Sequence, residues 1–288
     1  MNAQYITSSK KVKPFLRWAG GKRWLIKQLD DFLPQTFNKY HEPFIGGGAI
    51  FFHMNPKQAL ISDFNAELIE TYNAIKNNPH EVIKHIKSFK NTKEDYLKIR
   101  VQNFQSVEKR AARFIYLNQT SFNGIYRVNS DGKYNVPYGY REKYTFDFDN
   151  ILNVNRVLQS VDIEHLDFRK CIENVEENDL VFLDPPYTVA HNNNGFIQYN
   201  QKIFSLEDQY GLKDLIMRIK EKKAYYILTN ANHPKIREIF DVGDKITEVT
   251  RASMIGGKGA VRGKYSEVII TNTKGGEING VFNKWTSW

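Results

Sequence analysis

The sequence predicts an α/β fold, in which a parallel sheet with flanking helices is interrupted by an inserted segment of helices and a β-hairpin. Two observations predict the sheet: short apolar runs alternate with helical stretches over 14–75, and the same alternation resumes at about 161. A third predicts the insertion, since charged helical segments and an aromatic-rich hairpin pattern fill 76–160. We therefore expect a main domain of 1–75 and 161–288 and a second domain of 76–160 inserted in it.

The elements follow in order along the chain. "YHEPFIGGGAIFF" and "QALISDFNAELIETYNAI" predict strand, turn, helix, strand and helix in the first part of the sheet. "EVIKHIKSF" and "EKRAARFIYLNQ" have the charged, apolar-periodic pattern of helices in the insertion. Strands and helices then alternate again through "DLVFLD", "SLEDQYGLKDLIMRIKEKK", "AYYILTN", "PKIREIF", "KITEVT" and "SEVIITN".

Composition narrows the class of protein. No window approaches the ~20 apolar residues of a membrane span, and the N-terminus lacks the apolar core of a signal peptide, so we expect a soluble, cytoplasmic protein. The single cysteine, Cys171, has no partner for a disulfide and is a poor zinc ligand; we expect a buried thiol and no metal. A net charge of +9 favours a polyanionic partner such as nucleic acid, although many basic proteins bind none.

A glycine-rich turn is the first candidate binding site. Gly46 and Gly48 follow an apolar run and precede a helical one, where bare backbone and a helix start can approach a ligand closely. A tight structural turn is an equally good interpretation of the glycines alone. Asp63 ends the next predicted strand, seventeen residues on, where doubly wound folds place an acid on a ribose diol. Together they indicate an adenosine moiety, with a helix N-cap as the alternative for Asp63.

Trp18 and Lys22 flank two glycines in "RWAGGK". The stretch lacks the glycine spacing and the Ser/Thr of a triphosphate-binding loop, which argues against nucleotide hydrolysis. An aromatic face and a cation suit a ligand with an apolar edge and a carboxylate. An ordinary helix start with a core tryptophan remains the alternative.

The stretch "LVFLDPPY" is the second and stronger candidate. Its apolar run predicts a central parallel strand, and ligands of open α/β sheets bind at the carboxyl ends of such strands, where Asp184 stands. Pro185 and Pro186 direct the chain rigidly away, and the Pro185 carbonyl is free to accept a hydrogen bond. Tyr187 adds a flat face. Two acceptors and a stacking platform match a planar ring with an exocyclic amine; a capped edge turn is the alternative.

The insertion has the composition of a nucleic-acid surface. Residues 101–145 hold seven Lys/Arg, three Asp/Glu and nine aromatic residues, a mixture suited to phosphate contacts and base stacking. Within it, "IYRVNSDGKYNV" predicts two strands joined by an Asp-Gly turn, with Ile125, Arg127 and Asn129 on one face. Such a ribbon fits the DNA major groove, although a hairpin that packs its aromatics on the helices accounts for the other face.

In the same order along the chain, "RWAGGK", "PFIGGG", "FNGIYRVNSDGKYNVPYG" and "DPPY" resemble the DNA adenine-N6 methyltransferases of the Dam/DpnII (GATC-modifying) type. The resemblance covers about 14–273. It implies a Rossmann-like S-adenosylmethionine-dependent methyltransferase fold with an inserted DNA target-recognition domain, and double-stranded DNA as the partner.

The resemblance also implies roles for individual residues. The implied cofactor-binding residues are Trp18, Lys22, Phe44, Gly46, Gly48, Asp63, Asp167, Phe168 and Asp184. The implied catalytic residues are Asp184, Pro185, Pro186 and Tyr187. The implied DNA-binding residues are Asn123, Ile125, Arg127, Pro137 and Tyr138.

From these patterns and the resemblance we expect a monomeric enzyme that methylates the N6 amine of a flipped-out adenine in GATC or a related G-A-T site. We expect it to be paired in function with a restriction endonuclease, with a phage enzyme or a housekeeping enzyme as the alternatives. Amine methylation of another planar substrate and a non-catalytic duplex-binding module are the alternatives. Two loop-like stretches, 188–201 and 253–264, are candidates for ordering on DNA, with a surface loop and a hairpin connection as their respective alternatives.

Overall fold

The computed structural model describes residues 12–129, 131–140, 146–187, 204–252 and 264–275. The chain forms two compact units, one of Met1–Arg23 and Lys39–Asn174 and the other of Trp24–Asn38 and Val175–Trp288. These units are defined by how the chain packs. The predicted boundaries at 76 and 160 instead separate a catalytic domain from a DNA-recognition domain. The assignment of a catalytic and a recognition domain therefore stays a prediction. The two loop-like stretches, 188–201 and 253–264, lie outside the described residues except for Lys264.

The first unit contains three strands and most of the helices. In chain order its elements are β1 (Tyr40–Glu42), α1 (Ala49–Met54), β2 (Ala59–Asp63), α2 (Ala66–Asn77), α3 (Pro79–Ser88), α4 (Lys93–Val101), α5 (Val107–Thr120), η2 (Phe122–Gly124), α6 (Phe148–Leu158), β3 (Val161–His165) and η3 (Phe168–Glu173). The strands are parallel in the order β3-β2-β1. Their carboxyl ends therefore lie along one edge of the sheet.

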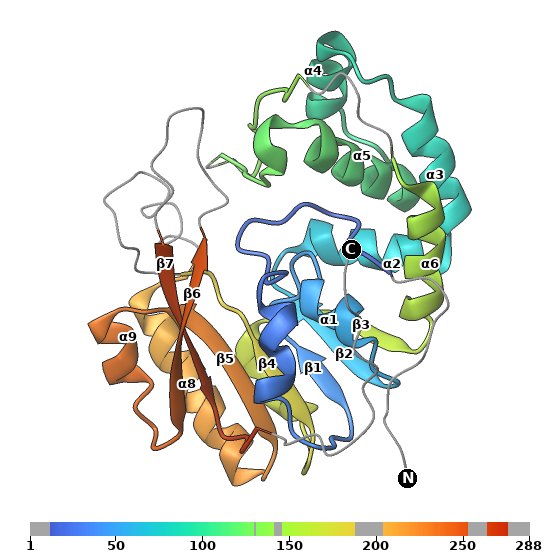
Figure 1. Cartoon of the computed structure of the whole chain (residues 1–288). Helices are drawn as coiled ribbons and strands as arrows, with labels where there is room; N and C mark the ends of the chain where they lie inside the picture. The colour runs from blue at the N-terminus through green and yellow to red at the C-terminus, as the bar shows by residue number, and fades with distance from the viewer. Residues whose placement is uncertain (1–11, 130, 141–145, 188–203, 253–263, 276–288) are drawn as a thin grey trace. The chain divides into compact units, whose positions relative to one another are not determined.

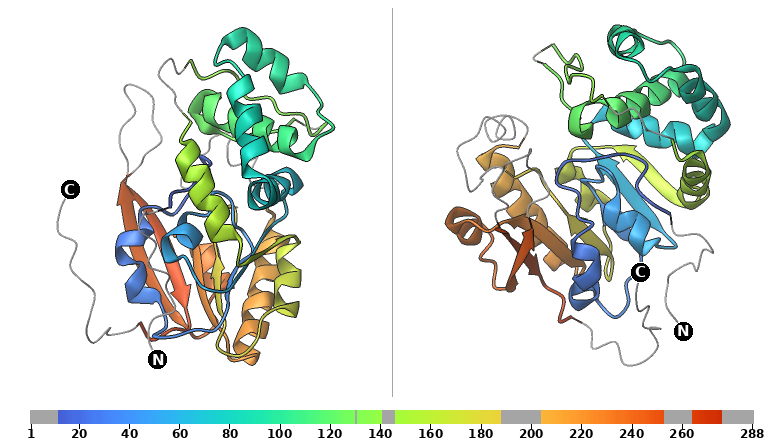
Figure 2. Two further views of the ribbon diagram at one scale, coloured as in Figure 1. Left: turned by 90° about the vertical axis from the view of Figure 1, so that its right-hand side faces the viewer. Right: turned by 45° about the horizontal axis from the view of Figure 1, so that its top comes forward.

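The helices of the first unit begin at residues that the sequence marks. Asn65, Thr92, Ser106 and Asp147 accept hydrogen bonds from backbone N–H groups in the first turns of α2, α4, α5 and α6. Helix α5 is buried along most of its second half because it packs against α2, α3 and α4. Figures 1 and 2 show α3, α4 and α5 grouped together.

The hairpin segment, residues 123–138, packs with α4 and α5 around a shared core that is rich in aromatic residues. The buried members are Tyr96, Ile99, Tyr116, Leu117, Tyr134 and Val136, with the rings of Phe89, Tyr126, Tyr138 and Phe146 packed against them. Its two arms are joined by an isolated bridge between Val128 and Tyr134, and the Asn129 N–H donates to the Lys133 carbonyl. The expected hairpin is thus present, as a pair of bridged arms rather than as two regular strands.

The second unit contains the rest of the sheet. Its elements are η1 (Leu25–Phe32), β4 (Leu180–Leu183), α8 (Leu206–Glu221), β5 (Tyr225–Ala231), α9 (Pro234–Ile239), β6 (Lys245–Ala252) and β7 (Lys264–Thr271). Strands β4 and β5 are parallel, β7 is antiparallel to β5 and β6, and the order is β4-β5-β7-β6. The described residues thus hold seven strands of a mostly parallel α/β sheet, and the predicted α/β fold is confirmed.

Two amides of α5 hold the N-terminal segment in the first unit. Asn118, buried, accepts a hydrogen bond from the Arg17 N–H at 2.8 Å and donates to the Arg17 carbonyl at 2.7 Å. The amide nitrogen of Gln119 donates to the Phe15 carbonyl at 2.6 Å. These bonds replace the strand pairing that the segment lacks and fix the residue that follows, Trp18.

Replacing Asn118 by alanine should therefore lower the free energy of unfolding by about 2–4 kcal/mol, since two backbone groups lose their buried partner. Urea denaturation measures the difference. The exposed amide of Asn103 supplies the control: Asn103→Ala should stay within about 0.5 kcal/mol of the wild type. A loss at Asn118 no larger than that at Asn103 would contradict this account of the segment.

Candidate functional site

Candidate binding residues of the first unit gather where its strands end. Asp63 is the last residue of β2 and pairs in register with His165, the last residue of β3. Phe44 follows β1 by two residues and Asp167 follows β3 by two. Because the three strands are parallel, these positions share one edge of the sheet, as the sequence predicts for a ligand site.

The glycine turn after β1 is packed closely against aromatic side chains. Gly46 and Gly48 have φ of 45° and 67°, a region that residues with a side chain rarely adopt. A Cβ at Gly46 would lie 2.6 Å from Cδ1 of Trp18, and one at Gly48 would lie 2.9 Å from the Tyr72 hydroxyl. Both positions therefore require glycine for two reasons: the backbone has a positive φ, and neighbouring side chains occupy the space that a Cβ would need.

Asp63 closes this turn. Its carboxylate accepts hydrogen bonds from the N–H of Gly46 at 3.1 Å and the N–H of Asn65 at 3.0 Å. Burial raises the pKa of Asp63 to about 6, against the opposing effect of these backbone donors and of His165. Asn65, and not Asp63, caps α2. The helix-cap alternative for Asp63 is therefore wrong.

Two aromatic rings stand beside this edge. Phe44 and Phe168 have ring centroids 5.3 Å apart, and the Arg169 guanidinium lies 4.5 Å from the Phe168 centroid. Asp167 accepts a hydrogen bond from the Arg169 N–H at 2.9 Å and forms an ion pair with its guanidinium at 3.0 Å. The four residues form one cluster, in which Asp167 also begins the short helix η3.

Trp18 lies between the glycine turn and the hairpin. Its ring stacks on Tyr126, with centroids 5.7 Å apart and planes 19° apart, and on Phe114 at 6.5 Å. The Tyr126 hydroxyl donates to a carboxylate oxygen of Glu67, at the start of α2, at 2.9 Å. Lys22 is only 3% exposed, and its ammonium donates to the Gly20 carbonyl at 2.9 Å. Trp18 is thus a bridge between two elements and does not begin a helix.

In the second unit, Asp184 follows the fully buried strand β4 directly. Its Oδ1 accepts a hydrogen bond from the hydroxyl of Thr229, a buried residue of β5, at 2.8 Å. Pro185 is buried and Pro186 half-buried, so the chain leaves the sheet along a fixed path. The carboxylate is therefore held from the neighbouring strand while Asp184 as a whole stays half-buried.

Tyr187 is the last residue of the quartet Asp184–Tyr187, the sequence "DPPY". Its hydroxyl donates to Oε2 of Glu267, in β7, at 2.5 Å. Glu267 is 2% exposed. Sequence analysis missed both Thr229 and Glu267; the one available signal for Glu267 is an acid inside the apolar strand "SEVIITN".

The candidate DNA-binding residues lie along the hairpin segment. Asn123 and Arg127 are exposed, and Nε of Arg127 donates to Oδ1 of Asn135 on the other arm at 2.8 Å. Asn123 has φ of 56°. Pro137 is exposed, while the half-buried Tyr138 donates its hydroxyl to Oδ1 of Asn91 at 3.0 Å. The half-buried Ile125 precedes Tyr126, whose ring faces Trp18.

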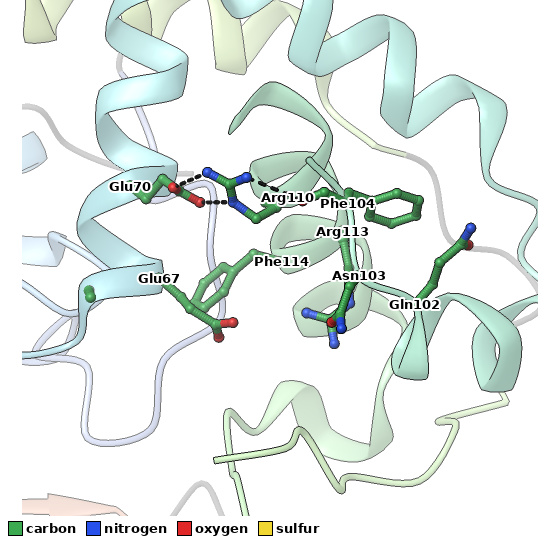
Figure 3. Close-up of a pocket in the computed structure, with 9 residues that line it drawn as sticks. Glu67, Glu70, Gln102, Asn103, Phe104, Arg110, Arg113 and Phe114 are labelled. Carbon is green, nitrogen blue, oxygen red and sulfur yellow. Dashed lines mark hydrogen bonds and ion pairs between the residues drawn. The ribbon is translucent and has the colours of Figure 1, made fainter. Parts of the chain in front are cut away.

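A pocket of about 390 Å³ in the first unit, lined by charged, amide and aromatic side chains, lies outside the predicted site (Figure 3). The Arg110 guanidinium in it forms two hydrogen bonds to the Glu70 carboxylate, at 2.6 and 2.8 Å, and another to the Gln105 carbonyl at 2.6 Å. Since its donors are engaged, we assign Arg110 the structural role of joining α2 to α5.

Within the described residues, no group of three or more His, Cys, Asp or Glu side chains is arranged to hold a metal ion. None of the helices in the described part of the chain is long and apolar enough to cross a membrane.

Comparison with known proteins agrees with the motifs. A family model described as D12 class N6 adenine-specific DNA methyltransferase matches residues 18–255. A Type II methyltransferase of Lactococcus lactis subsp. cremoris is 37% identical over 91% of this chain and 95% of its own length. DNA adenine methylases of Haemophilus influenzae and Escherichia coli K12 are 32% and 27% identical, over 92% and 90% of this chain and 96% and 95% of theirs. The chain belongs to the D12 class of N6 adenine-specific DNA methyltransferases.

Proposed function

We propose that this enzyme transfers a methyl group from S-adenosylmethionine to the N6 amine of an adenine turned out of double-stranded DNA, in GATC or a related G-A-T site. The observation that carries the proposal is the geometry of Asp184, whose Oδ1 is held by Thr229 at 2.8 Å at the carboxyl end of a buried parallel strand. The family supports the reaction type, and two of the three relatives above are named DNA adenine methylases.

The residues of the first unit fit S-adenosylmethionine. The ionised Asp63 carboxylate would accept hydrogen bonds from the ribose hydroxyls, and Gly46 and Gly48 lie in the turn that this carboxylate closes. Phe44 and Phe168 offer flat apolar faces for its adenine, and Asp167 would accept from the adenine amine. Trp18 and Lys22 would contact its amino-acid end. The sulfonium of S-adenosylmethionine supplies an electrophilic methyl group.

The chain's own residues would make the adenine amine reactive. Its nitrogen lone pair is delocalised into the ring, so the amine is a poor nucleophile. The Asp184 carboxylate and the Pro185 carbonyl can each accept one N–H, which favours a pyramidal nitrogen and stabilises the positive charge that develops on it. Tyr187 stacking would offset part of the few kcal/mol that base flipping costs. As the N–C bond forms, the sulfur–methyl bond would break with its electron pair left on the thioether product, and the Asp184 carboxylate would accept the proton that the N6 amine loses.

We assign the two functions to the two domains that the sequence predicts. Residues 1–75 and 161–288 would bind the cofactor and carry out the transfer, and 76–160 would read the DNA. We propose that the enzyme acts as a monomer in the cytoplasm and is paired with a restriction endonuclease. The relative from L. lactis, a Type II methyltransferase by name, supports that pairing.

Replacing Asp184 by alanine should lower kcat by at least about 10², the usual effect of removing one electrostatic stabiliser of the transition state. DNA affinity should survive. Transfer of tritiated methyl groups to DNA measures kcat, and a gel-shift titration measures binding. Asp241, an exposed acid of the same unit, gives the matched control, since Asp241→Ala should keep wild-type turnover. Near-normal turnover of Asp184→Ala would rule out the mechanism.

Cofactor affinity should weaken as the pH falls through about 6. The pKa of Asp63 is raised to about 6, so the carboxyl takes up a proton well above the usual pH for an aspartate. Ribose hydroxyl donors favour the ionised form, and below pH 6 binding must displace that proton. Calorimetric titration with S-adenosylmethionine between pH 5 and 8 should show this step in the wild type. Asp63→Asn should remove it and bind weakly throughout; an unchanged step in that variant would assign it to another group.

Arg127 should read the guanine next to the methylated adenine, because arginine pairs bidentately with guanine in the major groove. Arg127→Ala should lose about 1–3 kcal/mol of discrimination against replacing that guanine. Lys133, exposed on the same hairpin, is the control: Lys133→Ala should weaken all sequences alike. Sequencing the methylated positions in DNA treated with each variant measures the loss of guanine preference in Arg127→Ala and the uniform weakening in Lys133→Ala. Intact guanine preference in Arg127→Ala would show that another residue reads this base.

A further inference from the structure

An acidic residue occupies an interior position of the sheet. Glu267 lies in β7, which runs between β5 and β6, opposite Ala231 on one side and Val249 on the other. It is 2% exposed, and the three residues that follow it in the strand, Val268–Ile270, are fully buried. The chain therefore places a buried carboxyl group opposite two apolar residues of the neighbouring strands.

Sheet stability gives no reason for an acid at this position. Removing a carboxylate from water costs several kcal/mol, which hydrogen bonds and nearby charges offset only in part. An apolar residue of similar volume often serves a buried position equally well or better. The buried carboxylate therefore requires hydrogen-bond donors beside it.

The Tyr187 hydroxyl meets that requirement. It donates to Oε2 of Glu267 at 2.5 Å, across eighty positions of sequence within the same compact unit. At its other end the tyrosine is joined to Pro186, whose φ is fixed by its ring. The aromatic ring is thus held at both ends, by a rigid backbone and by an acceptor at the para position. These two restraints limit rotation of the ring about both of its side-chain torsions.

We infer that Glu267 is a positioning residue for the target base, which holds the Tyr187 ring in the orientation that stacks on it. The inference rests on the proposed function, since it requires a flipped adenine beside Asp184. Glu267 acts through Tyr187 and touches neither substrate nor cofactor. A ring fixed before the base arrives loses less conformational entropy on stacking, so both the flipped state and the transfer step benefit.

If Glu267 positions the ring, the expected activity of Tyr187→Phe is lower than stacking alone would predict. From the sequence, phenylalanine keeps the stacking face and is expected to retain much activity. With Glu267 beneath it, phenylalanine also removes a hydrogen bond from a buried carboxylate and releases the ring. The hydroxyl is therefore expected to matter through ring orientation.

The test uses the full-length enzyme and a duplex carrying 2-aminopurine in place of the adenine that the wild type methylates. Fluorescence of this base rises when it leaves the stack. Glu267→Met removes the acceptor, and Glu267→Gln keeps one. In Glu267→Met we expect a smaller fluorescence rise and a kcat on normal DNA about tenfold to a hundredfold lower, the range for losing a hydrogen bond to a charged group. Glu267→Gln should restore most of both signals.

Binding of S-adenosylmethionine separates positioning from damage to the fold. Among the proposed cofactor residues, Asp184 belongs to the same compact unit as Tyr187 and Glu267. Affinity for S-adenosylmethionine that stays at the wild-type value in Glu267→Met, Glu267→Gln and Tyr187→Phe would therefore show that the fold around Asp184 is intact. Tyr187→Phe removes the same hydrogen bond without altering β7, so it reports on the contact even where Glu267→Met folds poorly.

A double-mutant cycle decides the outcome. If Glu267 acts through Tyr187, the double variant Tyr187→Phe/Glu267→Met should be no slower than the slower single variant. Losses that multiply, or wild-type fluorescence and kcat in both single variants, would overturn the inference. Failure of the wild type to methylate adenine, or to raise the fluorescence of a duplex it methylates, would instead refute the proposed function.

Discussion

Trp18 can lie against the turn after β1 only because Gly46 and Gly47 have no side chains. A Cβ at Gly46 would meet its ring at 2.6 Å, and one at Gly47 would meet its Cβ at 3.0 Å. The same ring stacks on Tyr126, whose hydroxyl is bonded to Glu67. One aromatic side chain therefore joins the proposed cofactor turn to the proposed DNA-reading hairpin. The side-chain amides of Asn118 and Gln119 form hydrogen bonds with the backbone just before Trp18 and so fix the position of its ring.

In the second unit, side chains from other strands likewise hold the proposed catalytic quartet, Asp184–Tyr187. Asp184 directly follows β4. The group that orients it comes from β5, next to β4, and the group that orients Tyr187 comes from β7, next to β5. Both supports, Thr229 and Glu267, are buried polar side chains on the regular part of the sheet. Their positions are therefore more rigid than loop positions would be, which suits groups that must be held to fractions of an ångström.

Much of this arrangement follows from the sequence because it depends on local pattern. The strand and helix order, the glycine turn, Asp63 and the quartet are each marked by short runs with a defined spacing. The predicted hairpin forms, but as bridged arms, because its tyrosines are drawn into the aromatic core of α4 and α5. The Asp-Gly turn in the sequence correctly predicts that the chain reverses direction. The packing of the tyrosines determines that the two arms are bridged and do not form regular strands.

Thr229 and Glu267 were beyond sequence analysis for a different reason. Each is separated from its partner in the quartet by many residues, 45 for Thr229 and 80 for Glu267. A threonine inside a strand has the residue type that strands favour and gives no signal. Glu267 breaks the apolar pattern, yet the pattern does not say which donor faces it. Only the pairing of β5 with β7 and of β4 with β5 brings these side chains to the quartet.

The identity of the methylated atom tests the central claim most directly. The wild-type enzyme would be incubated with S-adenosylmethionine carrying a tritiated methyl group and unmethylated duplex DNA containing GATC, and the DNA would then be digested to nucleosides. The proposed roles of Asp184 and the Pro185 carbonyl predict that the label is recovered as N6-methyl-deoxyadenosine. Label on cytosine, or DNA that stays unlabelled while the protein binds it, would contradict the account.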